Sequence, residues 1–243
     1  MADEGTTDDD WVPPRVMVTV DLVILTVRAG RLDVLLIERG IEPYADRLAL
    51  PGGFIANEHE DTVDAADREL REETGLDSSE LHLEQLGAYA TPDRDPRGRV
   101  ITVAYLAIAP DLPAPTSGGD ARNARWQSAH YCVENDSLLA FDHHRILSDG
   151  LDRAIRKLEH TSLATQFCPE PFTIADLRRV YEAVWNASLD PRNFHRKVSK
   201  TSQFVIPIGR KRNSDTGRPA ELYRRGPATT LYPPMLRERA STH

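Results

Sequence analysis

Three glutamates stand close together in a segment whose spacing could hold a metal ion. Glu69, Glu72 and Glu73 occupy positions i, i+3 and i+4, so on a helix they project from one face. Carboxylates this close repel one another unless a cation neutralises them. Mg²⁺ prefers oxygen ligands and usually bridges carboxylates to a phosphate. The spacing therefore predicts a diphosphate and Mg²⁺ site, with a solvated acidic helix face as the alternative. The turn Pro51-Gly52-Gly53 ahead of the helix favours the site.

The segment that carries these glutamates resembles the Nudix box. The box ends in Arg-Glu-apolar-x-Glu-Glu-x-Gly-apolar, and residues 68–76 fit this pattern at every position. Glu60 lies seven residues before the arginine, as the box requires. The resemblance implies that Glu69, Glu72 and Glu73 hold the metal ion. Glu72 and Glu73 would be the catalytic residues if the protein hydrolyses its ligand.

The glycine end of the box departs from the pattern, which has five residues between the glycine and the first glutamate. Six residues separate Gly53 from Glu60. Choosing Gly52 and Glu58 gives five, but leaves nine residues before Arg68 in place of seven. The loop is one residue too long under the first alignment and two under the second, and in active family members this loop shapes the metal and water geometry. We therefore expect hydrolysis to be absent or vestigial, while binding is less affected.

A second set of residues is expected to contact the ligand itself. Arg39 and Arg47 flank the approach to the glycine loop, where their guanidinium groups could contact phosphate directly. The candidate ligand-binding residues are Gly52, Gly53, Arg39, Arg47 and Glu60.

The charge of the chain changes sign along its length. The 243 residues carry a net charge of −8, but residues 1–159 have 16 Lys and Arg against 31 Asp and Glu, and residues 160–243 have 14 against 7. A basic final third is typical of a surface that binds a polyanion. The length allows two domains, each with its own core. We therefore expect an acidic domain and a basic domain with different partners.

Two further features indicate the cellular compartment. Cys132 and Cys168 are the only cysteines and do not form a metal-binding spacing. No apolar run is long enough to cross a bilayer, and the N-terminus lacks the pattern of a signal peptide. We expect a cytoplasmic protein that does not contact the membrane.

The acidic part of the chain alternates between strand and helix patterns. Asp61 or Thr62 can cap the glutamate-bearing helix, and Gly75 can end it. Val63, Ala66 and Leu70 would form its buried face. A second helix opens at Asp142, a good cap, and the adjacent His143 and His144 are better explained as caps or interface residues than as metal ligands. Strands are expected at 16–26, 32–39, 47–50, 83–90 and 100–109 and around Trp126, with a loop at 110–119. This order predicts an α/β sandwich of the Nudix type.

The basic part of the chain carries clear helix signals. Thr173 with Asp176 forms a capping pair for a helix over 172–186. Asp190 followed by Pro191 is a favoured start for a second helix. Helix, tight turn and basic helix make a helix-turn-helix. The outward residues of the second helix suit phosphates and base edges; they are Arg192, Asn193, Arg196, Lys197 and Lys200.

A basic hairpin follows the second helix. The segments 204–209 and 220–225 are expected to pair, with Pro207 and Pro219 limiting them to an isolated ribbon. Arg210, Lys211, Arg212 and Arg218 would cluster at the tip and track a phosphate backbone. The alternative for such a hairpin is a solvated loop, but the neighbouring basic helix favours a DNA-binding wing.

Over residues 16–227 the chain resembles the Nudix-related transcriptional regulators of NAD metabolism, the NrtR family. The resemblance rests on LPGGF, the box, FDHHRIL, FTIADLRRVYEAV and GRPAELYRR. It implies an α/β Nudix sandwich followed by a smaller C-terminal winged helix-turn-helix domain. It further implies a homodimeric repressor of NAD biosynthesis or salvage genes that binds a palindromic double-stranded operator. ADP-ribose, bound in the Nudix-like domain with Mg²⁺, would release the DNA.

Domain boundaries follow from these patterns, and other functions stay open. We expect a flexible acidic tail at 1–14, the effector-binding domain at 15–160, a linker at 161–171, the winged domain at 172–232 and a flexible tail at 233–243. A Mg²⁺-dependent ADP-ribose diphosphatase with an accessory basic domain is the main alternative, since all three helical glutamates are present. An RNA-binding protein is less favoured, because no aromatic stacking platform accompanies the basic residues.

Overall fold

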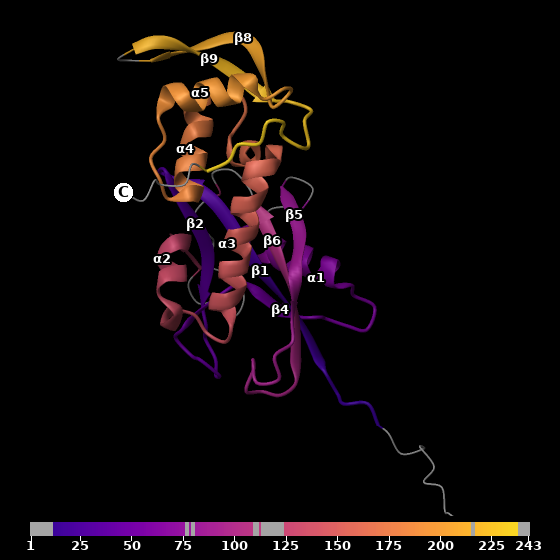
Figure 1. Cartoon of the computed structure of the whole chain (residues 1–243). Coiled ribbons are helices and arrows are strands. Elements are labelled where there is room, and N and C mark those ends of the chain that lie inside the picture. Colours follow the sequence, from indigo (N-terminus) through magenta and orange to yellow (C-terminus); the bar gives the residue numbers. More distant parts are fainter. Residues whose placement is uncertain are drawn as a thin grey trace, which may run out of the picture.

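A computed structural model describes residues 12–75, 78, 81–108, 112, 124–214 and 217–237. A mixed sheet with helices on both faces forms one end of the molecule, and a smaller helical domain with a two-stranded hairpin forms the other (Figure 1). The expected loop at 110–119 lies almost wholly outside the described residues. No described helix has the length and apolarity needed to cross a membrane.

The sheet is built around one long strand that is buried on both faces. β1 (Met17–Arg28) pairs antiparallel with β2 (Arg31–Glu38) and parallel with β6 (Val100–Ile108). The order is β3-β2-β1-β6-β5, with β3 at Leu48–Ala49 and β5 at His82–Tyr89; β4 (Gly52–Phe54) also pairs with β1 and β7 (Arg125–Ser128) with β2. Alternate β1 side chains enter different core clusters, since Leu22 packs in one and Val23 in the other.

The helix α1 (Thr62–Thr74) covers one face of the sheet and carries the glutamates. Asp61 is its N-cap and Gly75 ends it in the left-handed conformation at φ 73°, as expected. The predicted apolar face was wrong at one position, because Val63 is 47 % exposed. Ala65, Ala66 and Leu70 are buried instead, together with the carboxylate-bearing Glu69. The helix is therefore rotated so that an acidic residue faces inward.

The opposite face of the sheet is covered by α3 (His143–His160), with the shorter α2 (Ala129–Glu134) and the 3₁₀ turn η2 (Asp136–Leu138) beside it. Asp142 occupies the N-cap position of α3 but makes no capping hydrogen bond with its side chain. The expectation of a side-chain cap there was wrong, because Arg94 engages this carboxylate.

The segment that follows α3 is packed against both domains. Residues 162–167 form the 3₁₀ helix η3 (Ser162–Phe167), with Leu163, Ala164 and Phe167 buried. One core cluster runs from the sheet through η3 into the smaller domain. The hydroxyl of Tyr181 donates to the carbonyl of Leu158 at 2.9 Å, so the C-terminal end of α3 supports the smaller domain. The segment 161–171 is therefore a packed junction between the two domains.

The smaller domain is a winged helix. α4 (Ile174–Trp185) starts at the expected capping box between Thr173 and Asp176, and α5 (Pro191–Lys200) is capped by Asp190. β8 (Val205–Ser214) and β9 (Gly217–Arg225) form the hairpin. The predicted wing tip was wrong, because residues 210–212 lie within β8 and the strands extend to 214 and 217. Residues 209–213 of β8 are exposed, so this outer part of the ribbon can carry charged residues.

The C-terminal tail was expected to be flexible from residue 233, and its first part is not. Met235 is 1 % exposed, and its N–H donates to the carbonyl of Glu159 on α3 at 2.8 Å. The hydroxyl of Thr201 donates to the carbonyl of Pro233 at 3.3 Å. Residues 233–237 therefore tie α5 back to the larger domain.

Candidate functional site

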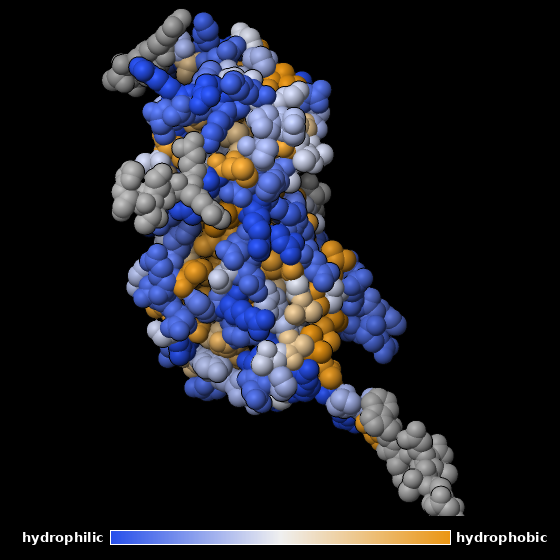
Figure 2. Space-filling model, viewed as in Figure 1, coloured by the Kyte–Doolittle hydropathy of each residue, from blue (hydrophilic) through white to orange (hydrophobic). Residues whose placement is uncertain are grey.

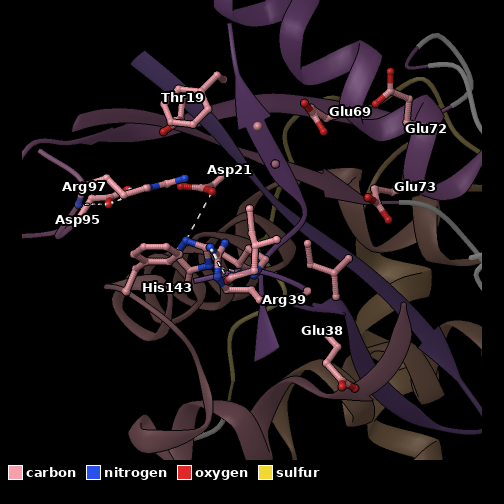
Figure 3. A pocket seen from close by; sticks show the side chains of 18 of the residues that line it. Thr19, Asp21, Glu38, Arg39, Glu69, Glu72, Glu73, Asp95, Arg97 and His143 are labelled. Atoms are coloured by element: carbon pink, nitrogen blue, oxygen red, sulfur yellow. Dashed lines mark hydrogen bonds and ion pairs between the residues drawn. The ribbon is translucent and has the colours of Figure 1, made fainter. Parts of the chain in front are cut away.

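One cavity in the larger domain collects most of the expected site residues. It has a volume of about 770 Å³ and opens beside the glycine loop. Glu69, Glu72 and Glu73 line one side, and Arg97, Asp95 and His143 lie on the other, with Asp21 between them (Figure 3). Gly52, Gly53 and Arg39 also line the cavity. Arg47 and Glu60 do not, although both were expected to contact the ligand.

The two glycines of the loop are required by close approaches. A Cβ on Gly53 would lie 2.2 Å from Oε1 of Glu69, and a Cβ on Gly52 would lie 2.2 Å from the carbonyl oxygen of Val20. A side chain at position 52 would push β4 away from β1, whereas one at position 53 would displace the carboxylate of Glu69. The glycines therefore bring the loop backbone against the glutamate helix.

Arg68 holds this arrangement from the helix. Its Nε donates to Glu60 at 2.9 Å, its Nη1 to Glu69 at 2.7 Å and its Nη2 to the carbonyl oxygen of Phe54 at 3.1 Å. One guanidinium group thus ties the loop to the helix. Glu58, the other candidate for the first glutamate of the box, has a side chain that is 87 % exposed. Glu60 therefore occupies the box position, and the extra residue lies between Gly53 and Glu60.

The environment of two of the glutamates, Glu69 and Glu73, disfavours their charged forms. Burial raises the pKa of Glu73 to about 7, and the charges of Glu69 and Glu72 add to this effect. Burial also raises the pKa of Glu69, although the guanidinium of Arg68 opposes it. A bound cation would stabilise the charged forms and so lower the pKa values of both carboxyl groups.

The three glutamates supply the type of ligand atom that Mg²⁺ needs, but their side chains do not surround a common point. Three carboxylates on one cavity wall supply the oxygen donors that this ion prefers. Within the described ranges, no three His, Cys, Asp or Glu side chains are gathered closely enough to coordinate an ion. Glu69, Glu72 and Glu73 would hold the ion, and their side chains must rearrange to do so. When bound, it would neutralise charge on a diphosphate.

A buried polar network on the far side of the cavity was not predicted from the sequence. Arg94 donates to Asp142 at 2.6 Å and to Asp21 at 3.4 Å. His143 faces Asp21 at 3.5 Å through Nε2 and accepts from the N–H of Leu50 at 2.9 Å through Nδ1. Burial lowers the pKa of His143, which favours the neutral ring that this hydrogen bond requires. The motif FDHHRIL thus contributes residues to the cavity and to the start of α3.

The proposed DNA-binding residues gather at the opposite end of the molecule. Phe194 and Val198 anchor α5 in the core, whereas Arg192, Asn193, Arg196 and Lys200 are exposed. The surface over this end is largely hydrophilic on the face seen in Figure 2. Arg210 and Lys211 are exposed on β8. The side chain of Arg218 lies outside the described part of the chain.

Two of the expected DNA contacts are engaged within the protein. Lys197 is half-buried, and its ammonium group donates to the carbonyl of Leu236 at 3.5 Å. Arg212 donates to Asp176 at 2.8 Å and to the carbonyl of Pro171 at 3.0 Å. Lys197 therefore contacts the C-terminal segment, and Arg212 holds the hairpin to the start of α4.

Comparison with protein families matches both halves of the chain. Residues 16–148 match the NUDIX domain, and residues 164–225 match the NrtR DNA-binding winged helix domain. The chain is 33 % identical over 212 residues to the ADPR responsive transcriptional repressor NtrR of Acinetobacter baylyi, which covers 87 % of this chain and 82 % of that protein. It is 42 % identical over 119 residues to the ADP-ribose pyrophosphatase of Methanocaldococcus jannaschii, covering 48 % of this chain and 64 % of that enzyme.

Solved structures show the same architecture. NrtR of Shewanella oneidensis in complex with a 27mer DNA superposes with a TM-score of 0.71 at 28 % identity, covering 86 % of this chain and 94 % of that one. The NUDIX domain of the same protein, in complex with ADP ribose, superposes with a TM-score of 0.51 at 28 % identity, covering 59 % of this chain and 94 % of that one.

Proposed function

The chain belongs to the NrtR family of Nudix-related transcriptional regulators, and on this premise we propose that it is an ADP-ribose-responsive repressor. It acts in the cytoplasm as a homodimer on a palindromic operator, and its target genes serve NAD biosynthesis or salvage. The observation that carries the proposal is the pairing of a cavity of about 770 Å³, lined by arginines and glutamates, with an exposed basic helix in one chain.

The cavity supports ADP-ribose as the ligand by its chemistry. It offers arginines for the diphosphate, glutamates for a bridging Mg²⁺ ion, and the aromatic rings of Phe54 and Phe141 beside them. A cavity of several hundred cubic ångströms is in the usual range for a ligand of this size.

The DNA-binding surface supports a major-groove reader. α5 presents its arginines, asparagine and lysine outward from a helix whose inner face is fixed by Phe194 and Val198. The second helix of a helix-turn-helix enters the major groove, and two such helices in a dimer must match the spacing of two half-sites. An effector that changes the dimer arrangement releases the operator, because the helices then no longer match that spacing.

Capture of genomic DNA tests this function. The full-length protein is immobilised, sheared genomic DNA is applied, and bound fragments are eluted with ADP-ribose and sequenced, with adenosine as the control eluent. The proposal expects fragments that share a palindrome, elute with ADP-ribose and stay bound with adenosine. Fragments that fail to elute with ADP-ribose, or that share no sequence, would contradict it.

A second candidate function is hydrolysis of ADP-ribose. The observation that favours it is that all three box glutamates line the cavity. Water would attack one phosphorus, forming a new P–O bond and breaking the bridging P–O bond to give AMP and ribose 5-phosphate. Chromatographic assay of AMP with Mg²⁺, for the intact protein and for Glu73→Gln, separates the functions. Many turnovers per second that disappear in Glu73→Gln would favour the enzyme over the sensor.

A further inference from the structure

Two arginines from different parts of the chain meet on one aromatic ring in the cavity. The guanidinium carbon of Arg39 lies 4.7 Å from the centroid of the Phe141 ring, and that of Arg97 lies 5.5 Å from it. Arg97 also lies 5.0 Å from the centroid of Phe54. Arg39 follows β2, whereas Arg97 belongs to the loop between β5 and β6. The fold therefore brings together two cations that the sequence separates.

The ring that gathers them is held in a strained position. Phe141 has a positive φ of 54°, a conformation that is an outlier for a bulky side chain. Tyr44 packs edge-on against the ring, with 4.8 Å between the ring centroids. The ring of His143, at the start of α3, lies 5.2 Å from it between centroids. Strain of this kind persists where the surroundings fix it, and it is concentrated at ligand sites.

The two guanidinium groups differ in how they are neutralised. Arg97 is paired with the buried carboxylate of Asp95, with Nη2 to Oδ2 at 2.6 Å. Arg39 has no carboxylate of the described residues within ion-pair distance; its Nε donates to the carbonyl of Pro43 at 2.8 Å. Burial, together with the nearby charge of Arg97, lowers the pKa of Arg39. A half-buried cation next to another cation is unfavourable until an anion joins them.

Arg97, one member of the pair, lies across the cavity from the glutamates (Figure 3). Figure 3 shows Arg97 and Asp95 on the opposite side of the cavity from Glu72 and Glu73. Planar guanidinium groups bind phosphate oxygens in bidentate fashion without a metal ion.

We propose that Arg39 and Arg97, which both lie against the ring of Phe141, bind the diphosphate of a nucleoside diphosphate ligand directly, without a metal ion. We call this pair of arginines the seat. This inference rests on the proposed function, because it assigns the effector's diphosphate to these residues. It also separates two tasks within one cavity. The arginines bind the ligand, and the glutamates and their metal ion serve hydrolysis or strengthen binding. A protein that retains ligand binding by the arginines and loses hydrolysis at the glutamates is a sensor with the fold of a hydrolase.

Calorimetric titration of the full-length protein in EDTA tests the seat. The probes are ADP-ribose and ADP, which carry a diphosphate, and adenosine, which does not. Wild-type protein is expected to bind both diphosphates in EDTA, and Arg39→Gln to weaken both at least tenfold while leaving adenosine unchanged. Arg28→Gln is the matched control, since Arg28 lies over the ring of Trp126 at 5.6 Å and outside the cavity.

Three results would overturn the seat: no diphosphate binding by the wild type in EDTA, wild-type affinity in Arg39→Gln, or an equal loss for adenosine, which would mean that the arginines stack on the base. Arg39→Lys, which keeps the charge, is expected to recover part of the affinity, and this recovery excludes misfolding as the cause. The two proposals fail separately. If ADP-ribose needs Mg²⁺ to bind yet releases DNA, the seat fails and the repressor stands. If ADP-ribose binds in EDTA through Arg39 yet leaves DNA bound, the repressor fails and the seat stands.

Discussion

His143 accepts a hydrogen bond from the backbone N–H of Leu50, with 2.9 Å between the two nitrogens. This contact joins the first turn of α3 to the residue that precedes the glycine loop. The other end of α3 supports the winged helix, where Leu158 accepts from the hydroxyl of Tyr181. At 1.5 Å per residue, the helix of 18 residues spans roughly 27 Å. One rigid element therefore contacts both the cavity and the DNA-binding domain.

Replacing His143 tests whether this contact shapes the cavity. His143→Phe removes the acceptor and leaves the buried N–H of Leu50 unpaired, at a cost on the order of 1–3 kcal/mol. We expect weaker ADP-ribose binding by calorimetry and nearly unchanged operator affinity in the absence of effector. His144→Phe is the control, because His144 contacts the carbonyl of Val133 on α2. Loss of operator affinity with retained ADP-ribose binding would show that His143 serves the other domain.

Arg68 is expected to be important for stability as well as for the site. Arg68→Ala removes four hydrogen bonds and leaves Glu69, which is 8 % exposed, without its counter-charge. Hydrogen bonds to charged groups contribute about 1.5–3 kcal/mol, so we expect urea unfolding to show a loss of at least about 2 kcal/mol. Arg71→Ala, on the same helix but directed at Asp67, should lose less. Equal losses would mean that the loop is held by other contacts.

The raised pKa of Glu73 gives a pH dependence of defined sign. The folded carboxyl titrates at about 7 and the unfolded one near 4.5, so between these values the folded state binds more protons than the unfolded state. Without divalent ions, this residue's contribution to the free energy of unfolding therefore falls as pH rises from about 4.5 to 7 and is constant above. Urea unfolding in EDTA should show a decline in wild type that is reduced in Glu73→Gln. Identical profiles would show that Glu73 titrates normally.

The affinity for Mg²⁺ should also depend on the ionisation of Glu73, but it should rise with pH where the stability falls. An ion can bind only the charged carboxylate, so affinity is expected to rise with pH through 7 and to release a proton. Calorimetry in two buffers of different ionisation enthalpy measures the proton release. Absence of release at pH 6.5 would exclude Glu73 as a ligand.

Two neighbouring residues of α5 differ in exposure, since Arg196 is exposed and Lys197 is half-buried. Arg196→Ala should weaken operator affinity and reduce the salt slope by about one, if Arg196 contacts a phosphate. Lys197→Ala should change the salt slope less, since Lys197 is half-buried against the C-terminal segment. Fluorescence anisotropy at several salt concentrations gives both slopes. A larger effect at Lys197 would mean that the C-terminal segment moves away when DNA binds.

Local signals were sufficient for much of this structure. The capping box at Thr173 and the Asp190-Pro191 start each depend on residues within one turn, and both helices begin where they predict. The polar network could not be predicted in this way. His143 meets Leu50 across 93 positions and Arg94 meets Asp142 across 48, and only the sheet topology brings them together. The strand ends of the wing were also missed, since charged residues are tolerated in the exposed outer part of a ribbon.

Reciprocal titration measures the coupling between ADP-ribose binding and DNA binding. A labelled operator duplex obtained by selection is titrated with full-length protein by fluorescence anisotropy, with and without saturating ADP-ribose, and ADP-ribose is titrated calorimetrically with and without the duplex. We expect ADP-ribose to weaken DNA binding at least tenfold, or about 1.4 kcal/mol, and DNA to weaken ADP-ribose binding by the same factor. Equal operator affinity in the presence and absence of bound ADP-ribose would contradict this expectation.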